Sequence, residues 1–325
     1  MKRFITRLLI FCLAPMAGLL ALGYVVDAGL HKSRHFYYAE WNDLYDGKIN
    51  ADLIIQGTSR AWVHFSPQML DSAFGINSYN LGMDAAPFDM QYERFKIYLR
   101  HNKKPKYILQ EVGFNTTLMR SKSLPLFQQF LPYLHDTALW RVYKNLYPKV
   151  TLVERYFPLY KYNNQLPVLK EGIWSYMGKG RAPVKYKGYL GQEKQWDSSF
   201  GNMVRSNPEG IRWAVEPSAV ALYREFLDYC KANDIKVIMV YTPFYYELDR
   251  YILNHAEVKK VLEGFATEYN LPYLDYTHCY LDSSKQYYYN SQHLNKEGSV
   301  RFTKMLIEDL KPLIAAMPPA TGNSN

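Results

Sequence analysis

Short apolar runs alternate with amphipathic stretches early in the sequence, and this alternation restricts the possible folds more than any other feature. Residues 51–56, 76–82 and 106–113 have the composition of buried strands. A helix is expected to begin at Ser66, because a proline follows it at the first helical position, and another helix covers 89–101. Since parallel strands need a crossover connection, this order predicts a parallel sheet.

Residues 116–213 interrupt this pattern, which returns afterwards. The interrupting stretch is rich in Tyr, Trp, Pro and Lys and contains helical pieces at 124–131 and 137–147. We interpret it as an inserted cap and not as an independent domain, since long insertions in compact domains usually carry function or are disordered. The regular pattern then resumes with helices at 217–233, 258–269 and 295–313 and with strands at 235–243 and 271–275.

The N-terminus predicts a membrane anchor. Residues 8–26 are uncharged, and as a helix they would extend about 28 Å, close to the thickness of the hydrocarbon core of a bilayer. This run is longer than the core of a signal peptide, and no convincing cleavage site follows it. Three basic residues before the run favour a cytoplasmic N-terminus, although Lys32 and Arg34 follow the run.

These observations predict three regions. Residues 1–34 form an uncleaved anchor, and residues 35–317 form one α/β domain outside the cytoplasm that carries the cap at 116–213. The tail 318–325 consists of small and polar residues, and we expect it to be disordered.

Composition excludes some classes of function. The net charge of +9 favours contact with anionic lipid or an acidic polymer, but the Lys and Arg residues are scattered, which argues against nucleic-acid binding. No Cys or His spacing suggests a metal site, and no cofactor is expected. Cys12 lies in the anchor, whereas Cys230 and Cys279 are able to pair in an oxidising compartment, a question that the sequence leaves open.

Two residues at the ends of predicted elements suggest nucleophilic chemistry. Ser59 lies in the Gly-x-Ser turn at the end of the first predicted strand, and His293 precedes the last predicted helix. A serine hydroxyl is a poor nucleophile until an imidazole within hydrogen-bond reach accepts its proton. Each residue alone is more often a turn or packing residue, so the prediction depends on their meeting in the fold.

Four short motifs, taken in order, resemble the motif blocks of the SGNH hydrolase superfamily. The motifs cover the chain from about residue 51 to 313 and are Gly57-Thr58-Ser59, Asn80-Leu81-Gly82, Gly113-Phe114-Asn115 and His293. In the family, Gly-Asp-Ser is commoner in the first block. The resemblance implies a three-layer α/β fold, flavodoxin-like, with helices on both faces of a parallel sheet. It also implies that Ser59 attacks an ester carbonyl and that His293 takes and later returns a proton.

The resemblance further implies an oxyanion hole. Its donors are the backbone N–H of Ser59 or a neighbour, the N–H of Gly82 and the side-chain amide of Asn115. Preorganised donors of this kind are worth on the order of 3 kcal/mol each. Arg60, which follows the serine, is a candidate for binding an anionic substrate, with pairing to a carboxylate as the equal alternative.

The chain departs from the family pattern at the third catalytic member. The family usually has an acid three residues before the histidine, and that position holds Asn290. An amide oxygen is able to orient an imidazole but stabilises imidazolium less than a carboxylate does. With Asn290 as the candidate third member, we leave open a site that works as a Ser59–His293 dyad, substitution by Asp275 or Asp282, or a low activity. Asp275 is the reserve acid.

The anchor, Arg60 and the His293-Leu294-Asn295 motif together resemble membrane-anchored SGNH-like proteins of envelope glycan O-acylation, such as the D-alanyl transfer protein of teichoic-acid modification. The resemblance implies a single-pass protein of the bacterial inner membrane whose globular domain faces the periplasmic or extracellular side. It also implies a multispanning membrane-bound O-acyltransferase as partner and an anionic or neutral envelope glycan as acceptor.

Three functions remain possible at this point. The first is an envelope O-acyltransferase, and the second is an envelope carbohydrate esterase that removes acetyl groups. The third is a non-catalytic scaffold that binds a glycan or a partner, a reading that Asn290 favours and that the intact Ser59, Gly82, Asn115 and His293 oppose. In the enzymatic readings, we expect the 116–213 cap to cover the mouth of the site and to line a groove with aromatic rings.

Overall fold

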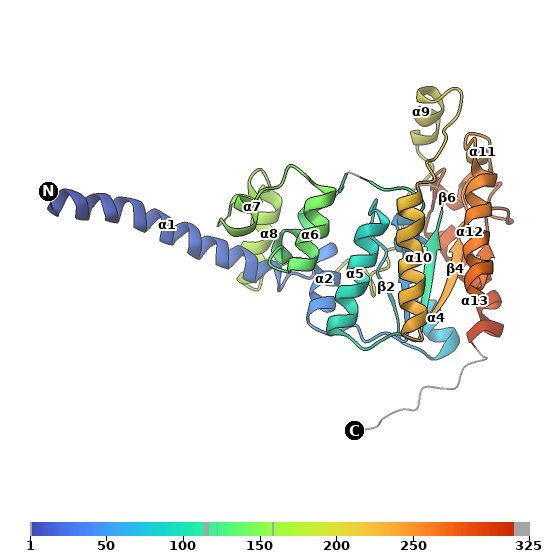
Figure 1. Cartoon of the computed structure of the whole chain (residues 1–325), viewed down its shortest axis with the longest axis horizontal. Helices are drawn as coiled ribbons and strands as arrows, with labels where there is room; N and C mark the ends of the chain where they lie inside the picture. Colours follow the sequence, from blue (N-terminus) through green and yellow to red (C-terminus); the bar gives the residue numbers. More distant parts are fainter. Residues whose placement is uncertain (1, 114–116, 122, 158, 315–325) are drawn as a thin grey trace, which may run out of the picture. The chain divides into compact units, whose positions relative to one another are not determined.

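The structure is a computed structural model, and it describes residues 2–113, 117–121, 123–157 and 159–314 (Figure 1). Contacts divide the chain into two compact units. The first unit contains Met1–Lys48, Glu93–His101 and Ser121–Val184, and the second contains Ile49–Tyr92, Asn102–Arg120 and Lys185–Asn325. The stretch 116–213 therefore contributes to both units, and its role as a cap stays a prediction.

The second unit is built on a five-stranded parallel sheet, as the sequence predicts. The strand order is β2-β1-β3-β4-β5, which is the doubly wound, flavodoxin-like order. The strands are β1 (Leu53–Gln56), β2 (Ser78–Asn80), β3 (Tyr107–Val112), β4 (Lys236–Tyr241) and β5 (Tyr273–Asp275). The order reverses between β1 and β3, and ligands of such sheets bind outside the carboxyl ends of the strands at that switch point.

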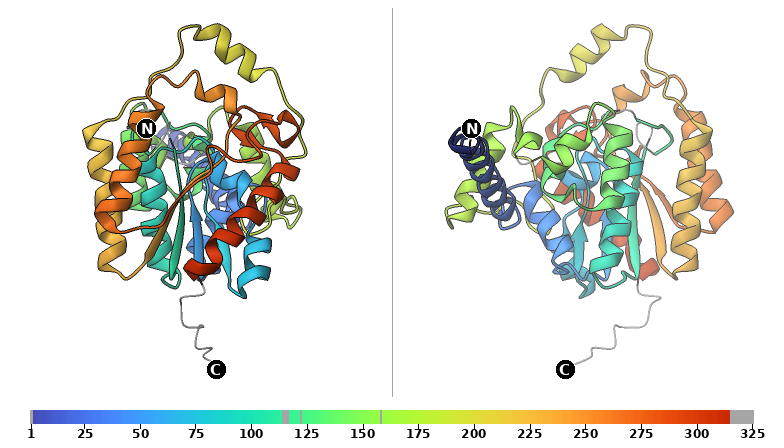
Figure 2. Two further views of the ribbon diagram at one scale, coloured as in Figure 1. Left: turned by 90° about the vertical axis from the view of Figure 1, so that its right-hand side faces the viewer. Right: turned by 60° about the vertical axis from the view of Figure 1, so that its left-hand side comes forward.

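Helices cover both faces of this sheet (Figure 2). One face carries α5 (Phe88–His101), α10 (Pro217–Ala232) and α12 (His255–Tyr269). Their rings connect them, since Phe88 lies 5.0 Å from Tyr223, which lies 4.9 Å from Phe265. The other face carries α3 (Ser59–His64), α4 (Pro67–Phe74) and α13 (Lys296–Ile314). The three-layer prediction is therefore confirmed.

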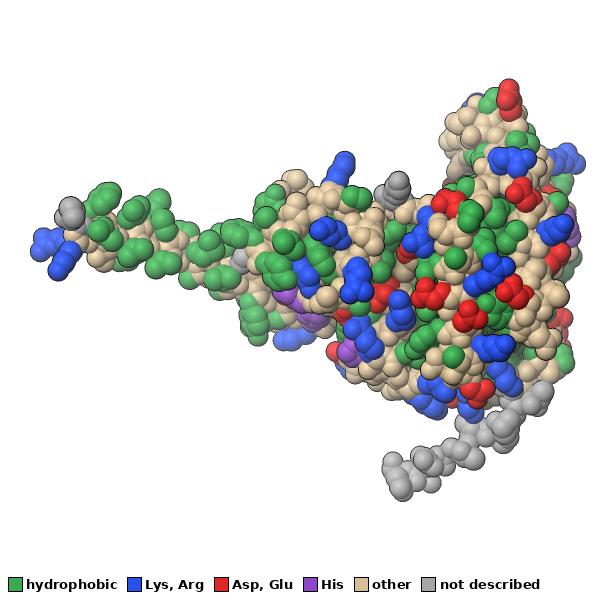
Figure 3. Space-filling view, viewed as in Figure 1, with side chains coloured by type: hydrophobic (Ala, Val, Ile, Leu, Met, Phe, Trp, Pro, Cys, Tyr) green, Lys and Arg blue, Asp and Glu red, His purple; other side chains and the backbone are tan. Residues whose placement is uncertain are grey.

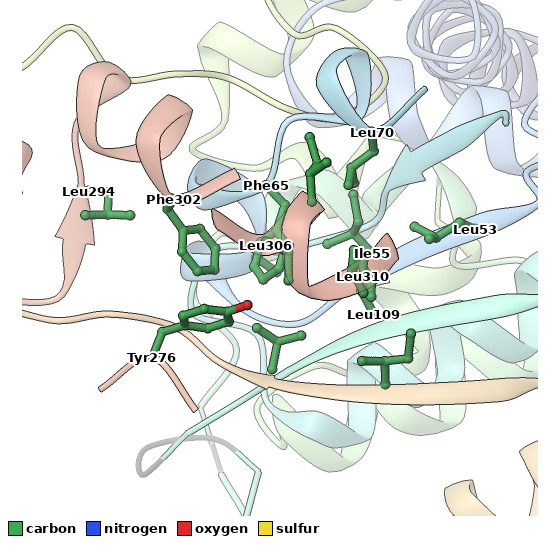
Figure 4. Packing of buried hydrophobic residues seen from close by; sticks show 14 of the residues in the cluster. Leu53, Ile55, Phe65, Leu70, Leu109, Tyr276, Leu294, Phe302, Leu306 and Leu310 are labelled. Carbon is green, nitrogen blue, oxygen red and sulfur yellow. The ribbon is translucent and has the colours of Figure 1, made fainter. Parts of the chain in front are cut away.

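Alternation along the strands explains the core beneath α13 (Figure 4). Leu53 and Ile55 point to the same face because side chains two residues apart share a face of a strand. They are fully buried in one cluster with Leu109 of β3 and with Phe302 and Leu306 of α13. This cluster fixes the position of α13, and therefore of the segment before it that carries His293.

A short antiparallel hairpin precedes α13 and was not anticipated from the sequence. It consists of β6 (Tyr288–Asn290) and β7 (His293–Leu294), with an irregular register that pairs Asn290 with His293. The remaining helical elements of this unit are α9 (Ser199–Ser206), α11 (Tyr246–Asp249) and η3 (Lys285–Tyr287).

The first unit is helical. Its elements, besides part of α5, are α1 (Lys2–Leu30), α2 (Tyr37–Tyr45), η1 (Phe127–Tyr133), α6 (Thr137–Leu146), α7 (Leu152–Tyr156), η2 (Tyr160–Tyr162) and α8 (Leu166–Tyr176). Trp41 is buried at its centre, where its ring packs on Phe130 and Tyr133. The predicted pieces at 124–131 and 137–147 correspond to η1 and α6, whereas α7 and α8 were missed.

Among the described residues, α1 is the one helix long and apolar enough to cross a membrane. Its hydrophobic side chains are exposed along most of its length, with basic side chains at its N-terminal end (Figure 3). Pro15 lies inside the helix without ending it. Cys230 and Cys279 are both free thiols, so the open question of their pairing is answered in the negative. The tail 318–325 lies outside the described residues.

Candidate active site

The position of Ser59 follows from a turn that only glycine fits. β1 ends at Gln56, and Gly57 has a φ of +152°, in the range that favours glycine. A Cβ on Gly57 would lie 2.6 Å from the Glu111 Cβ and 2.8 Å from the Ala61 Cβ. Thr58 then caps α3, and Ser59 is its first residue. The chain thus changes from strand to helix at the serine, which stands at the carboxyl end of β1.

Ser59 and His293 meet, although they lie far apart in the sequence. The Ser59 Oγ is 2.7 Å from the His293 Nε2, within the range that proton transfer requires. Both residues are half-buried. Leu294, which follows the histidine, is fully buried in the core cluster under α13, so the hairpin that carries His293 is firmly seated.

Asn290 holds the other side of the imidazole. Its Oδ1 lies 2.9 Å from the His293 Nδ1 and also accepts the backbone N–H groups of Gln292 and His293, each at 3.0 Å. Two of these donors are backbone amides, so the oxygen must point toward them. The Nδ1 therefore carries the proton, and the Nε2 is left to accept the Ser59 proton. Ser59, His293 and Asn290 form one continuous relay.

The alternative acids are engaged elsewhere. Asp275 pairs with Lys259 at 2.5 Å and accepts the Thr277 hydroxyl at 2.7 Å. Burial opposes ionisation, but the hydrogen bonds from Lys259 and Thr277 prevail and lower the pKa of Asp275. The Asp282 carboxylate lies 3.9 Å from His278. The Nδ1 of His293 is occupied by Asn290, so the reserve assignment of Asp275 is not supported by this structure.

The Arg60 side chain is buried inside the protein. Its side chain is 1% exposed and pairs with the Glu111 carboxylate at 2.7 Å. A Cβ on Gly113 would lie 2.0 Å from the Arg60 guanidinium, so the backbone of Gly113 closes over it. The structure therefore corrects the substrate-binding role of Arg60 in favour of the alternative, a buried ion pair with a carboxylate.

Glu111 is the residue that sequence reasoning missed. Its second carboxylate oxygen accepts the Thr58 N–H and the Thr58 hydroxyl, both at 2.9 Å. One buried side chain of β3 thus binds the residues on both sides of Ser59, because it also pairs with Arg60. An acidic residue inside the mainly apolar run 107–112 was the available signal, since buried charges in proteins are paired.

The predicted oxyanion donors differ in availability. Within the described part of the chain, the Ser59 N–H has no hydrogen-bond acceptor, as expected for the first turn of a helix. The Gly82 N–H donates to the Asn80 Oδ1 at 2.8 Å. A Cβ on Gly82 would lie 2.4 Å from the Trp62 nitrogen, so this glycine permits close packing on α3. Asn115 lies outside the described residues.

A second histidine, His64, holds the segment that carries His293 through a hydrogen bond. His64 ends α3, is fully buried, and accepts the Leu294 N–H on its Nε2 at 3.0 Å. Its ring lies 6.3 Å from that of His293. Burial, with the positive charge of Arg60 and any charge on His293, lowers the pKa of His64 well below its usual value. His64 is thus a neutral acceptor that fixes the strand of His293. No sequence motif pointed to it.

The electrostatics of the site disfavour imidazolium. Desolvation, followed by the charges of Arg60 and Lys194, lowers the pKa of His293 to about 3, against a smaller opposing effect of Asp197. Asn290 is neutral and does not offset these effects. The imidazole is therefore fully in its base form at neutral pH, but it is a weak base.

Aromatic and charged side chains border the relay. The Tyr289 ring stacks on the His293 ring at 5.3 Å and 10°, and the Lys194 Nζ lies 5.3 Å from the Tyr289 ring centre. The Lys185 Nζ lies 4.8 Å from the Trp62 ring centre. Part of the predicted insertion, residues 185–213, thus supplies cations beside aromatic rings of this unit.

No group of His, Cys, Asp and Glu side chains suited to a metal ion occurs among the described residues. No family model and no curated protein matches the sequence. Similar solved structures include a candidate acylhydrolase from Bacteroides fragilis, with 13% identity, a TM-score of 0.36 and coverage of 81% of this chain and 87% of that one. Another is a GDSL-like lipase from Bacteroides thetaiotaomicron, with 13% identity, a TM-score of 0.34 and coverage of 79% and 87%. At these values the likeness assigns no activity to this chain.

Proposed function

We propose that the protein is a serine-dependent acyl-transfer enzyme of the SGNH type. The observation that carries this proposal is the relay in which Asn290 Oδ1 holds His293 Nδ1 at 2.9 Å and His293 Nε2 meets Ser59 Oγ at 2.7 Å. Nucleophile, base and orienting group in one line are the signature of covalent catalysis at serine. The relay stands at the carboxyl end of β1, next to the switch point of the sheet.

The reaction follows from these contacts. The Ser59 Oγ attacks the carbonyl carbon of an ester while His293 takes the hydroxyl proton. The Ser59 N–H is placed to donate to the oxyanion. Collapse of the intermediate expels the alcohol, which receives the proton from His293, and leaves an acyl-serine. A second hydroxyl, activated by His293 in the same way, then takes the acyl group and restores Ser59.

The acceptor in our proposal is a hydroxyl of an envelope polysaccharide, and the donor is supplied by a multispanning membrane-bound O-acyltransferase. Two features support it. The candidate span α1 has the length and composition to hold the chain at a membrane, and the basic net charge of +9 suits an anionic glycan. The basic residues before the span favour a cytoplasmic N-terminus, and in that orientation the globular part would face the periplasmic or extracellular side.

Packing supports retention of α1 as an anchor. Val26 and Leu30 of α1 are fully buried, and Asp27 accepts a hydrogen bond from the Lys161 Nζ at 2.9 Å. Removing α1 would expose these partners in the first unit. A cleaved signal sequence has no need for such contacts.

Two alternatives are each favoured by specific observations. Ser59 is half-exposed, so water can reach the acyl-serine and accept the acyl group. In that case the protein would be an envelope carbohydrate esterase. The lowered pKa of His293 and the neutral Asn290 weaken the base, which favours a non-catalytic SGNH-like scaffold that binds a glycan or partner.

The deciding experiment uses the full chain in detergent. We expect a fluorophosphonate probe to label the wild type and Ser198→Ala, which removes an exposed serine, but not Ser59→Ala. Turnover of an aryl acetate should follow the same pattern. Equal labelling of wild type and Ser59→Ala would refute the nucleophile. No labelling of either, with glycan binding retained, would establish the scaffold.

A further inference from the structure

The segments 152–157 and 159–177, which contain α7, η2 and α8, expose many large apolar side chains, and together we call them the collar. The exposed fraction is 75% for Leu166, 64% for Tyr156 and 58% for Leu152. Single exposed apolar residues are normal on soluble proteins, but a contiguous set marks an interaction surface. The further members of the set are Val153, Phe157, Tyr160, Trp174, Tyr176 and Met177.

The collar is attached directly to the C-terminal part of α1 (Figure 1). A Cβ on Gly29 would lie 1.7 Å from the Gly172 carbonyl oxygen, so α1 and α8 pack backbone to backbone. The ion pair between Lys161 and Asp27, at 2.9 Å, joins η2 to the same end of α1. The collar is therefore held at a fixed level along the helix.

Part of the collar lies beside residues of α1 that belong to the apolar run 8–26. A cavity of about 790 Å³ is lined by Leu19 of α1 together with Leu159, Leu166 and Leu169 of the collar region. Leu19 lies about 18 Å beyond Arg7 along the helix axis, at 1.5 Å per residue. The hydrocarbon core is about 30 Å thick. When α1 crosses a bilayer with its basic end at one surface, this cavity opens in the opposite half of the bilayer.

Pairs of basic and aromatic side chains border the apolar surface, as is common for proteins at a lipid interface. The Lys170 Nζ lies 4.3 Å from the Trp174 ring centre, and the Lys32 Nζ lies 5.0 Å from the Tyr176 ring centre. Trp and Tyr concentrate where headgroups meet acyl chains, and basic side chains there reach the phosphates. Basic and apolar side chains lie side by side on this part of the surface (Figure 3).

We propose that the collar is embedded in the outer interfacial layer of the bilayer that α1 crosses, with lipid acyl chains against Leu166 and in the cavity beside Leu19. Lipid is favoured over a protein partner because the exposed apolar set continues from the surface of the span itself and is edged by basic–aromatic pairs. The proposal depends on membrane insertion of α1 and is independent of the reaction at Ser59.

The test places a fluorescent label at defined positions of the full chain in vesicles of phosphatidylcholine and phosphatidylglycerol. The background carries Cys12→Ala and Cys279→Ser and keeps the buried Cys230. The labelled variants are Leu166→Cys in the collar, Leu22→Cys in α1 and Lys48→Cys, a side chain 62% exposed in the same unit. Lipids that carry a quencher on the acyl chain then report contact with the hydrocarbon.

We expect the labels at Leu166 and Leu22 to lose most of their emission and the label at Lys48 to keep it. A quenched Leu22 label with a Leu166 label as bright as that at Lys48 would overturn the collar proposal and leave a protein as the occupant of this surface. A bright Leu22 label would overturn membrane insertion of α1, and the collar proposal with it.

A second variant tests whether the apolar side chains are what holds the collar in lipid. Tyr156→Glu combined with Leu166→Glu places charges on the apolar surface, and a label at Met177→Cys follows the position of the collar. We expect the Met177 label to lose its quenching while the Leu22 label in the same variant keeps it. Unchanged quenching at Met177 would show that the apolar surface does not hold the collar in lipid.

Discussion

Asn290 Oδ1 lies 2.9 Å from His293 Nδ1, so an uncharged amide occupies the place where a carboxylate would stabilise imidazolium. We predict that Asn290→Asp keeps or raises kcat/KM on an aryl acetate, because the added negative charge raises the pKa of His293. Asn290→Ala should reduce activity by less than Ser59→Ala does. The measurement is kcat/KM as a function of pH. A Ser59→Ala enzyme with wild-type activity would contradict the whole relay.

The lowered pKa of His293 predicts an unusual pH profile. An imidazole base must be neutral, and with a pKa of about 3 it stays neutral far below the usual value of 6.5. The wild-type kcat/KM should therefore show no fall between pH 7 and about pH 5, within the range where an unperturbed histidine titrates. In Asn290→Asp the acidic limb should move to higher pH. A wild-type limb centred near 6.5 would contradict the prediction.

The same histidines should make stability depend on pH. The folded-state pKa values of His293 and His64 lie below the unfolded value, so the unfolded chain binds more protons. The contribution of these two histidines to stability is then present above about pH 6.5 and is lost progressively as the pH falls toward 3. Urea midpoints of the full chain in detergent at pH 7 and pH 5 test this, and Asp275, whose pKa is also lowered, contributes only below about pH 4. Equal midpoints would contradict it.

Glu111 should be far more sensitive to substitution than acids in exposed ion pairs. Glu111→Gln leaves Arg60 buried without its counter-charge, which costs about 3–5 kcal/mol of unfolding free energy. The matched control is Glu268→Gln, which breaks an exposed pair with Arg224 and should cost at most about 1 kcal/mol. Urea titration measures both. Activity should also fall in Glu111→Gln, since the single amide oxygen of glutamine is unable to accept from Thr58 and face Arg60 at the same time, which disturbs the segment around Ser59. Equal costs would refute the buried-pair argument.

Gly57 should tolerate no side chain. Its φ of +152° and the approach of the Glu111 Cβ to 2.6 Å predict that Gly57→Ala lowers stability and abolishes activity. Gly264→Ala in α12 is the control, because no atom lies within 4 Å of its added Cβ, and it should stabilise the helix by about 0.5–1 kcal/mol. Thermal unfolding and esterase assays compare the two. A fully active Gly57→Ala enzyme would contradict the geometry.

The sheet could be predicted from sequence because its central strands β1, β3 and most of β4 are buried on both faces and therefore read as mainly apolar runs. The edges of these runs were less clear, and β2 and β5 each proved to be three residues long. The strand order could not be predicted from local pattern, since it depends on which crossover each helix makes.

Some residues of the candidate site could likewise be predicted from the sequence, and others could not. Ser59, His293 and Asn290 could be placed because each follows or precedes an element with a clear signal. Glu111 and His64 could not, because their roles depend on contacts between residues distant in the sequence. Burial decided the role of Arg60, and burial is a property of the folded chain that a single sequence does not show.

The contact between Gly29 and Gly172 has a practical consequence for anyone who works with this protein. A form cut after Leu30 would uncover the face of α8 that receives α1, and a foreign span with a larger residue at position 29 would push the two helices apart. The natural first helix is therefore a structural element of the first unit and not an interchangeable tether. Secretion and solubilisation strategies should keep it.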